Sequence, residues 1–475
     1  MNVHCVARMY CPSLLRPFLA RLGASPLGLR LASGTFWVMI GTATSRMLNL
    51  LAMVVVARLL GKSVFGELGM VRATVGMLGL FAGFSLGLTA TKHVAEFKKK
   101  DPERAGRIIA LSWTVSAVTG GTMAVVLVLL GPWLAKHTLN APHLAPMLQI
   151  GAGIVFLNAL NGAQTGALSG FEAFRTIAVV NFCVGIAGFP LLAFGAWIGN
   201  LGGALWALVA NLGIHWLLNH LALRTEAHRQ GVPLRISGCA SELPILWSFS
   251  LPVVISGILT GPVMWSCRSL LAHQPDGYSA LGTLAVAESW RIIPLFLCTM
   301  IAQANLPIMS QLYAEGRMRS LKKMLTAQFC LNGAIAVGGA LSVSLLSKPI
   351  MRAYGSEFAA DYPVLVPIMI STVPMQLTTV VGTLNRCIGK VWWNALFNAA
   401  WALVYMLSTI LLVELKALGL AWAILIAYSF QFLLAAMYMF SLIQEHRSKA
   451  YKCLDDERGH SVQTAISTKT CMENL

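Results

Sequence analysis

Three arginines lie inside long apolar runs of this sequence, where a charged side chain is costly. Arg46, Arg72 and Arg291 fall within such runs, and Glu288 is the one carboxylate at comparable depth. A guanidinium at the centre of a bilayer costs about 2.5–3.5 kcal/mol on insertion scales, so it normally faces a wet cavity or a charged partner. This excess of positive charge at depth predicts a pathway for an anionic substrate.

The composition places these residues in an integral membrane protein. Of the 475 residues, 57% are hydrophobic and only 11% are charged, and the mean hydropathy is +0.70. Such a chain lacks the polar surface that a soluble protein of this size needs. Apolar stretches of about 20 residues, the length of a transmembrane helix, recur about twelve times. We therefore expect an all-α integral membrane protein with about 12 transmembrane helices in two six-helix lobes around a central cavity.

The longest polar connection between these stretches divides the chain into two halves. The predicted organisation is a basic cytoplasmic N-terminal segment, an N-terminal lobe, a cytoplasmic inter-lobe loop, a C-terminal lobe and a mobile cytoplasmic tail. Their boundaries are residues 1–30, 31–224, 225–244, 245–443 and 444–475. Six spans in each half would give both lobes the same orientation, related by an axis along the membrane normal.

A weak internal repeat supports this division. The segment Ala57–Gly69 resembles the segment Cys267–Gly282, about 210 residues later. Each lies where the first predicted span of a half passes to the second. A two-lobed transporter built from repeats would produce this pattern.

The net charge of +17 is explained by membrane topology rather than by nucleic-acid binding. With a cytoplasmic N-terminus, most Lys and Arg residues fall in cytoplasmic segments, and one of the densest contains Lys98, Lys99 and Lys100. An even number of spans then puts both termini in the cytoplasm. The ten cysteines follow no disulfide or metal-binding pattern, and neither a metal nor a cofactor is expected.

Depth within the predicted spans separates the charged residues. Arg46 lies about twelve residues into the first span, roughly 18 Å at 1.5 Å per residue, and Arg291 lies at similar depth in the eighth. Arg72 is shallower. Glu288 precedes Arg291 by three residues on the same helical face, so these two side chains either neutralise each other and brace the bundle or serve the substrate.

Other features near the predicted outer face favour structural roles. Arg58 and Arg268 lie close to this interface and are explained as anchors or braces of the repeat turns. The run Gly61–Ser63 resembles the end of a phosphate-binding loop, but the required earlier glycine is replaced by Val56. We therefore reject nucleotide binding there.

Polar side chains at three- and four-residue spacing form stripes along several predicted helices. Such faces could line a cavity that accepts sugar hydroxyls, or they could form hydrogen bonds between helices, each worth about 0.6 kcal/mol. The stripes contain Asn158, Asn161 and Thr165, then Asn211, His215 and Asn219, then Gln376, Thr379 and Thr383. The candidate substrate-binding residues are Arg46, Arg72, Arg291, Glu288, Asn158, Asn161, Asn211 and His215.

Five segments carry a resemblance to a known family. They are Ala57–Gly69, Gly87–Arg107, Ala167–Asn181, Ala304–Gly316 and Tyr354–Ile368. Together they resemble the polysaccharide-biosynthesis branch of the multidrug/oligosaccharidyl-lipid/polysaccharide exporter superfamily, which contains the Wzx-type flippases. The resemblance extends over roughly residues 31–442.

This resemblance implies a secondary transporter rather than an enzyme. It implies two lobes in a V that move a polyprenyl-diphosphate-linked oligosaccharide across the bacterial inner membrane, for synthesis of O-antigen, capsule or exopolysaccharide. Arg46, Arg72 and Arg291 would engage the diphosphate. The expected partners are this lipid-linked oligosaccharide, membrane lipids, and a polysaccharide polymerase or glycosyltransferases, with no nucleic acid.

Two alternatives stay open at this point. The first is a multidrug or other-substrate antiporter of the same superfamily, but an exporter of organic cations would be expected to place carboxylates and aromatic rings at depth. The second is a membrane-embedded polysaccharide polymerase or ligase. Such enzymes commonly carry a large outer loop, whereas the predicted outer connections here are all under about twenty residues.

Overall fold

The computed structural model describes residues 26–83, 86–234, 238–245, 259–315, 317–441 and 444. In these residues all regular secondary structure is helical. Eight helical segments, of 26 to 57 residues, are long and apolar enough to cross a membrane. The expected all-α membrane fold is confirmed. The expected terminal segments, residues 1–30 and 444–475, lie almost wholly outside the described residues.

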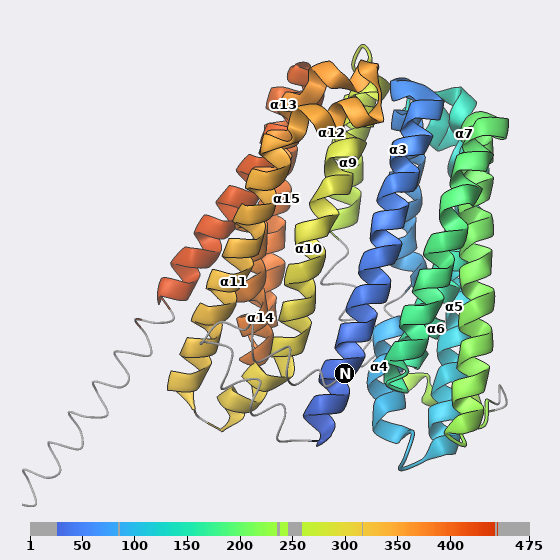
Figure 1. The fold of residues 1–475 in the computed structure, drawn as a ribbon, viewed down its shortest axis with the longest axis vertical. Helices are drawn as coiled ribbons and strands as arrows, with labels where there is room; N and C mark the ends of the chain where they lie inside the picture. The colour runs from blue at the N-terminus through green and yellow to red at the C-terminus, as the bar shows by residue number, and fades with distance from the viewer. Residues whose placement is uncertain are drawn as a thin grey trace, which may run out of the picture.

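Five helices, four of them long, form the N-terminal lobe (Figure 1). They are α3 (Pro26–Gly83), α4 (Leu86–Phe97), α5 (Pro102–Trp133), α6 (Ala145–Gly170) and α7 (Phe174–Arg229). A π-helical turn, Leu134–Thr138, and a short 3-10 helix, Pro142–Leu144, connect α5 to α6. The helix α7 extends five residues past the expected lobe boundary at 224, because the backbone continues to hydrogen-bond until the N–H of Gln230 donates to the carbonyl of Glu226.

Two of these helices are hairpins of two helices each. A residue with positive φ breaks α3 at Gly61 (φ 75°) and α7 at Asn200 (φ 51°). Glycine adopts such a φ without steric cost, which explains the residue found at the first break. Each break lets the chain turn back, so that Gly195 in α7 contacts the backbone of Gly203. The total of twelve spans stays a prediction, because residues 246–258 lie outside the described part.

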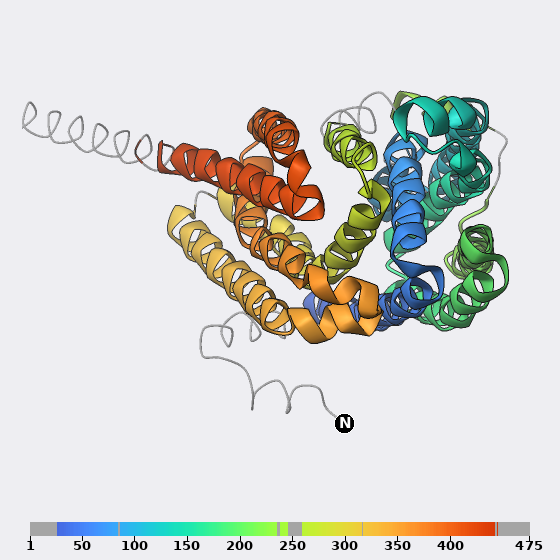
Figure 2. The same ribbon diagram turned by 90° about the horizontal axis from the view of Figure 1, so that it is seen from above.

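The C-terminal lobe contains more and shorter helices (Figures 1 and 2). In order they are α9 (Thr260–Ala272), α10 (Gly277–Ala314), α11 (Met318–Leu345), α12 (Ser347–Tyr354), α13 (Tyr362–Ile370), α14 (Thr372–Cys387), α15 (Val391–Leu412) and a last helix over residues 416–441. A short 3-10 helix, Cys239–Glu242, precedes this lobe and packs on α5, where Glu242 binds Arg104 and Arg107.

Hydrogen bonds and an ion pair join the two lobes at one end of the molecule. We call this the closed end and define it by residues 58–69, 134–139, 269–282 and 353–361. The Nε of Arg58 donates to the carbonyl of Ala353 at 2.6 Å. The Nζ of Lys62 lies 2.5 Å from Asp361, and the hydroxyl of Tyr278 donates to the carbonyl of Leu139 at 2.7 Å.

The internal repeat of the sequence matches a reciprocal pattern of contacts at the closed end. In the N-terminal lobe the first repeat segment, around Arg58 and Lys62, contacts the residues that follow α11. In the C-terminal lobe the second repeat segment contacts the residues that follow α5, through Ser269 to the carbonyl of Thr138 and through Tyr278. The repeated segments therefore occupy equivalent places, and each binds the opposite lobe.

Two glycines let the backbones of α3 and α10 touch within this contact. A Cβ at Gly66 would lie 1.8 Å from the carbonyl oxygen of Tyr278, and a Cβ at Gly282 would lie 2.2 Å from that of Lys62. Only glycine fits at such distances. Next to them the rings of Phe65 and Phe358 meet edge to face, with centroids 6.3 Å apart. The lobes are thus packed tightly here as well as hydrogen-bonded.

Candidate anion site between the lobes

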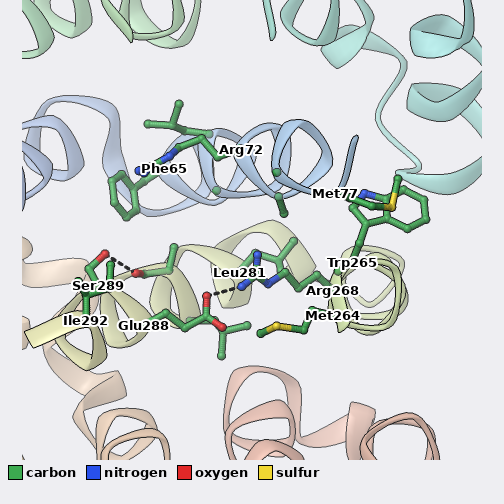
Figure 3. Close-up of a pocket in the computed structure, with 17 residues that line it drawn as sticks. Phe65, Arg72, Met77, Met264, Trp265, Arg268, Leu281, Glu288, Ser289 and Ile292 are labelled. Atoms are coloured by element: carbon green, nitrogen blue, oxygen red, sulfur yellow. Dashed lines mark hydrogen bonds and ion pairs between the residues drawn. The ribbon is translucent and has the colours of Figure 1, made fainter. Parts of the chain in front are cut away.

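A cavity of about 360 Å³ lies between the lobes, next to the contact of Gly66 and Gly282 at the closed end. Three helices line it: α3 from the N-terminal lobe, and α9 and α10 from the C-terminal lobe. The charged side chains on its wall are Arg72 from α3, Arg268 from α9 and Glu288 from α10 (Figure 3). The indole of Trp265 also lines the cavity and donates from Nε1 to Thr74 at 2.9 Å, which ties α9 to α3.

The carboxylate of Glu288 pairs with Arg268. The Nη2 of Arg268 donates to the Oε2 of Glu288, and both side chains are less than one-fifth exposed. Of the two alternatives for Glu288 and Arg291, a direct ion pair between them is not found: within the described residues Glu288 pairs with Arg268, and Arg291 makes no ion pair. Arg268 reaches Glu288 from the neighbouring helix α9, whereas Arg291 follows Glu288 on α10 itself.

The expected role of Arg268, an anchor or brace of the repeat turn, differs from its place in the structure, where it lines the cavity. It lies near the C-terminal end of α9, which predicted an anchor at the outer face. Helical side chains, however, point back toward the helix N-terminus, and an arginine side chain is long. Its guanidinium therefore extends into the cavity, where Glu288 receives it. Sequence reasoning did not include Arg268 among the candidate site residues. The available signal was Glu288, because a carboxylate at depth needs a cationic partner and a neighbouring span can supply it.

Arg291 is the most deeply buried of the arginines predicted from the sequence. The residue is only 8% exposed, and its guanidinium carbon lies 5.9 Å from the centre of the Tyr428 ring. Its Nη1 has no hydrogen-bond partner among the described residues. Arg291 lies within the C-terminal lobe and does not line the cavity.

The other two predicted arginines are exposed and lie between the lobes. Arg72 lines the cavity, and its Nη1 lies 3.4 Å from the sulfur of Met53 on the preceding helix of the α3 hairpin. The guanidinium of Arg46 lies over the ring of Phe296 in α10, 4.6 Å from its centre. Arg46 and Arg72 are thus in the N-terminal lobe and both face the C-terminal lobe.

The predicted polar stripes mostly make contacts within the N-terminal lobe. Asn161 is buried; its Nδ2 donates to the carbonyl of Leu212 at 3.1 Å, and its Oδ1 accepts from Asn219 at 3.3 Å. Asn219 also donates to Thr165 at 3.2 Å. These bonds join α6 to α7, so the interpretation as hydrogen bonds between helices is favoured for this stripe.

The remaining polar candidates are more dispersed. Asn158 is exposed and His215 is partly exposed. The buried Oδ1 of Asn211 has no hydrogen-bond partner in the described part of the chain, and its amide packs against Gly188. None of the three lines the cavity. Their role in substrate binding stays a prediction.

Replacing Asn161 with alanine should lower the free energy of unfolding by about 1 kcal/mol, because two interhelical hydrogen bonds of about 0.6 kcal/mol each are lost. Denaturant-induced unfolding in detergent micelles would measure this. Asn158→Ala, on the same helix but exposed, is the matched control and should change stability little. Equal losses for the two variants would contradict the structural role of Asn161.

Two helical lobes with a cavity between them, into which charged side chains project, are the architecture of a membrane transporter. The chain belongs to the polysaccharide biosynthesis protein family, whose model matches residues 31–313. The EPS I polysaccharide export inner membrane protein EpsE of Ralstonia nicotianae (strain ATCC BAA-1114 / GMI1000) is similar. It is 25% identical over 373 residues, which cover 75% of this chain and 82% of that protein.

Solved structures of transporters share this fold. An inward-facing multidrug resistance MATE family transporter of the MOP superfamily superposes with a TM-score of 0.71 and 15% identity, over 84% of this chain and 96% of the transporter. The lipid II flippase MurJ, in an inward closed conformation, superposes with a TM-score of 0.64 and 14% identity, over 85% of this chain and 87% of MurJ. At these identities the likeness concerns the fold alone. The protein is a multi-pass membrane protein with the MOP fold.

Proposed function

We propose that this protein is a flippase that moves a polyprenyl-diphosphate-linked oligosaccharide across the bacterial inner membrane for surface polysaccharide synthesis. Membership of the polysaccharide biosynthesis family and similarity to an inner membrane exporter of polysaccharide support this function. The observation that carries it is the charge of the inter-lobe cavity, where Arg72 and Arg268 outnumber Glu288. A diphosphate would supply the missing negative charge.

The geometry favours entry of the substrate from the cytoplasm. The first helix of the α3 hairpin runs from Pro26 to Gly61, which lies at the closed end. With the N-terminus in the cytoplasm, as the positive-inside bias predicts, the closed end faces the periplasm. The cavity would then be reached from the cytoplasmic side in this conformation. Release on the other side requires the lobes to rock apart at the closed end.

The charges of the cavity disfavour one alternative, and the similar proteins disfavour the other. A site for organic cations would need an excess of carboxylates, whereas guanidinium groups are in excess at this cavity. A polymerase or ligase is disfavoured because the similar proteins are exporters and transporters. In the proposed role the sugars pass between the lobes, and the lipid tail stays in the bilayer. Association with a polymerase or with glycosyltransferases stays a prediction.

The test is surface polysaccharide in cells that carry alanine variants. Arg46→Ala and Arg72→Ala should each reduce surface polymer strongly and cause lipid-linked units to accumulate on the cytoplasmic face. The control is Arg229→Ala at the end of α7, where the side chain of Arg229 is 79% exposed, and it should have no effect. Western blotting establishes equal expression. Normal polymer in both the Arg46 and the Arg72 variants would refute the proposed site. Accumulation of outward-facing units on deletion would indicate a polymerase instead.

A further inference from the structure

The inter-lobe loop binds back onto the N-terminal lobe through one acidic residue. Glu242 is buried, and its carboxylate pairs with Arg104 at 3.1 Å and with Arg107 at 3.5 Å, both in the first two turns of α5. Three residues earlier, Cys239 packs against a buried apolar pair that includes Leu111 of the same helix. The segment that follows α7 therefore covers a basic face at the start of α5.

The start of α11 carries an equivalent group of cations that no acidic residue covers within the described part of the chain. Arg319 and Lys322 stand 215 residues after the two arginines of α5 and keep their spacing of three residues, which places them on one helical face. Lys323 adjoins them, and all three residues are exposed. The neighbouring ion pair joins Arg317 to Glu315 and leaves the three cations without a counter-ion among the described residues. We call these three residues the basic face, and it fits an anionic partner.

The C-terminal segment, which lies outside the described residues, contains a sequence that matches the inter-lobe loop. Asp455, Asp456 and Glu457 are three consecutive carboxylates, which we call the acidic triplet. Asp456 follows Cys453 by three residues, as the glutamate of the inter-lobe loop follows its cysteine, and it stands 214 residues after that glutamate. The stretch 452–458, with the lysine and the arginine that flank the triplet, keeps a net charge of −1. The basic face and its acidic counterpart are thus both repeated, at nearly the same distance along the chain.

The last helix brings the chain to the basic face before the C-terminal segment begins. It packs on α11, where the rings of Phe432 and Phe329 have centroids 6.4 Å apart, and its red end lies beside the start of α11 in both views (Figures 1 and 2). Arg319 is ten residues from this ring contact and Gln444 is twelve, which correspond to about 15 and 18 Å of helix. Twelve further residues lead from Gln444 to Asp456 and can span up to about 40 Å. The acidic triplet can therefore reach the basic face of its own chain.

We propose that the acidic triplet binds the basic face, so that the C-terminal segment covers the start of α11 as the inter-lobe loop covers the start of α5. The partner is this segment because it combines the complementary charge, the matching spacing and a starting point beside the face. Carboxylates and cations at an exposed site attract each other through water, so the contact is weakened by salt. The inference is independent of the transported substrate, and the failure of either proposal leaves the other standing.

The test is zero-length carbodiimide cross-linking of the full-length protein in phosphatidylcholine nanodiscs, with the products identified by mass spectrometry. The reagent joins a lysine amine to a carboxylate only where the two are in contact. The main variant, Arg319→Gln/Lys322→Gln, removes two charges of the basic face and keeps Lys323 as the reactive amine. The matched control, Lys99→Gln/Lys100→Gln, removes the same charge from exposed positions in the turn between α4 and α5. Thermal unfolding of each variant checks that it is folded.

We expect the wild type to form a cross-link between Lys323 and the acidic triplet within one chain. Its yield should fall at least about fivefold in the main variant, and also in the wild type at 1 M salt, where the Debye length is about 3 Å. The control variant should cross-link as the wild type does. Trypsin should cleave after Arg458 more rapidly in the main variant than in the wild type, because the segment is no longer held.

Three outcomes would overturn the proposal. The first is the absence of this cross-link in the folded wild type, or an equal yield in the main variant. The second is a cross-link found only between two copies of the chain, which would make the partner a second molecule. The third is retention of phosphatidylglycerol by the wild type but not by the main variant, without the cross-link, which would assign the basic face to anionic lipid headgroups.

Discussion

Gly66→Ala should separate the lobes at the closed end and reduce transport by roughly 5- to 150-fold. The new Cβ would lie 1.8 Å from the carbonyl oxygen of Tyr278 and 2.8 Å from the backbone nitrogen of Gly282. A Cβ has no rotamer by which it can move aside, so the backbones must part. Overpacking costs about 1–3 kcal/mol. Here it destabilises only the conformation in which the lobes touch, so the population of that conformation should fall by roughly 5- to 150-fold.

Surface polysaccharide in cells and maleimide labelling of an introduced cysteine would measure this effect. Leu281→Cys is a suitable reporter, because Leu281, next to Gly282 where the cavity meets the lobe contact, is 3% exposed and should become accessible when the contact opens. The matched control is Gly79→Ala on the same hairpin, where an added Cβ meets no atom within 4 Å. Wild-type polymer and an unlabelled reporter in the Gly66→Ala protein would show that this contact does not control transport.

Glu288→Ala should lower the free energy of unfolding by about 3–5 kcal/mol, because it leaves the guanidinium of Arg268 without a counter-ion in a mostly buried position. Removing both charges is expected to be less harmful than removing one. The double variant Arg268→Ala/Glu288→Ala should therefore be more stable than Glu288→Ala. Denaturant titration in micelles measures the free energy of unfolding of the wild type, of Glu288→Ala and of the double variant.

An exposed ion pair provides the control for this comparison. Glu315 lies 3.4 Å from Arg317, with side chains 40% and 52% exposed. Exposed pairs contribute about 0–1 kcal/mol, so Glu315→Ala should change stability little. If Glu288→Ala were no more damaging than Glu315→Ala, or if the double variant were less stable than Glu288→Ala, Glu288 would not be acting as the counter-ion of Arg268.

The reciprocal contacts at the closed end show how far a pattern in the sequence can be interpreted. The similarity of Ala57–Gly69 to Cys267–Gly282 predicted equivalent positions in two lobes, and both segments do contact the opposite lobe. It did not predict equal roles for their arginines. Arg58 donates to a backbone carbonyl at the closed end, whereas Arg268 pairs with Glu288 at the cavity. The difference comes from α10, which places a carboxylate beside only one of them.

The sequence by itself determined the class of protein. Long apolar runs can enter a bilayer only as helices, because every backbone N–H and C=O must find its partner within the segment, and this requirement is local. The same runs placed Arg291 and Glu288 at depth, and the structure finds both on α10 with Arg291 buried.

Only the tertiary structure decided which side chains meet. Arg268 and Glu288 are 20 residues apart on two helices, and Asn161 and Asn219 are 58 apart on two others. Periodicity along one helix tells which residues share a face, but the neighbour of that face depends on how the helices pack. For this reason the sequence indicated an excess of arginine at depth, whereas the packing of α3, α9 and α10 determined that Arg72 and Arg268 share the cavity.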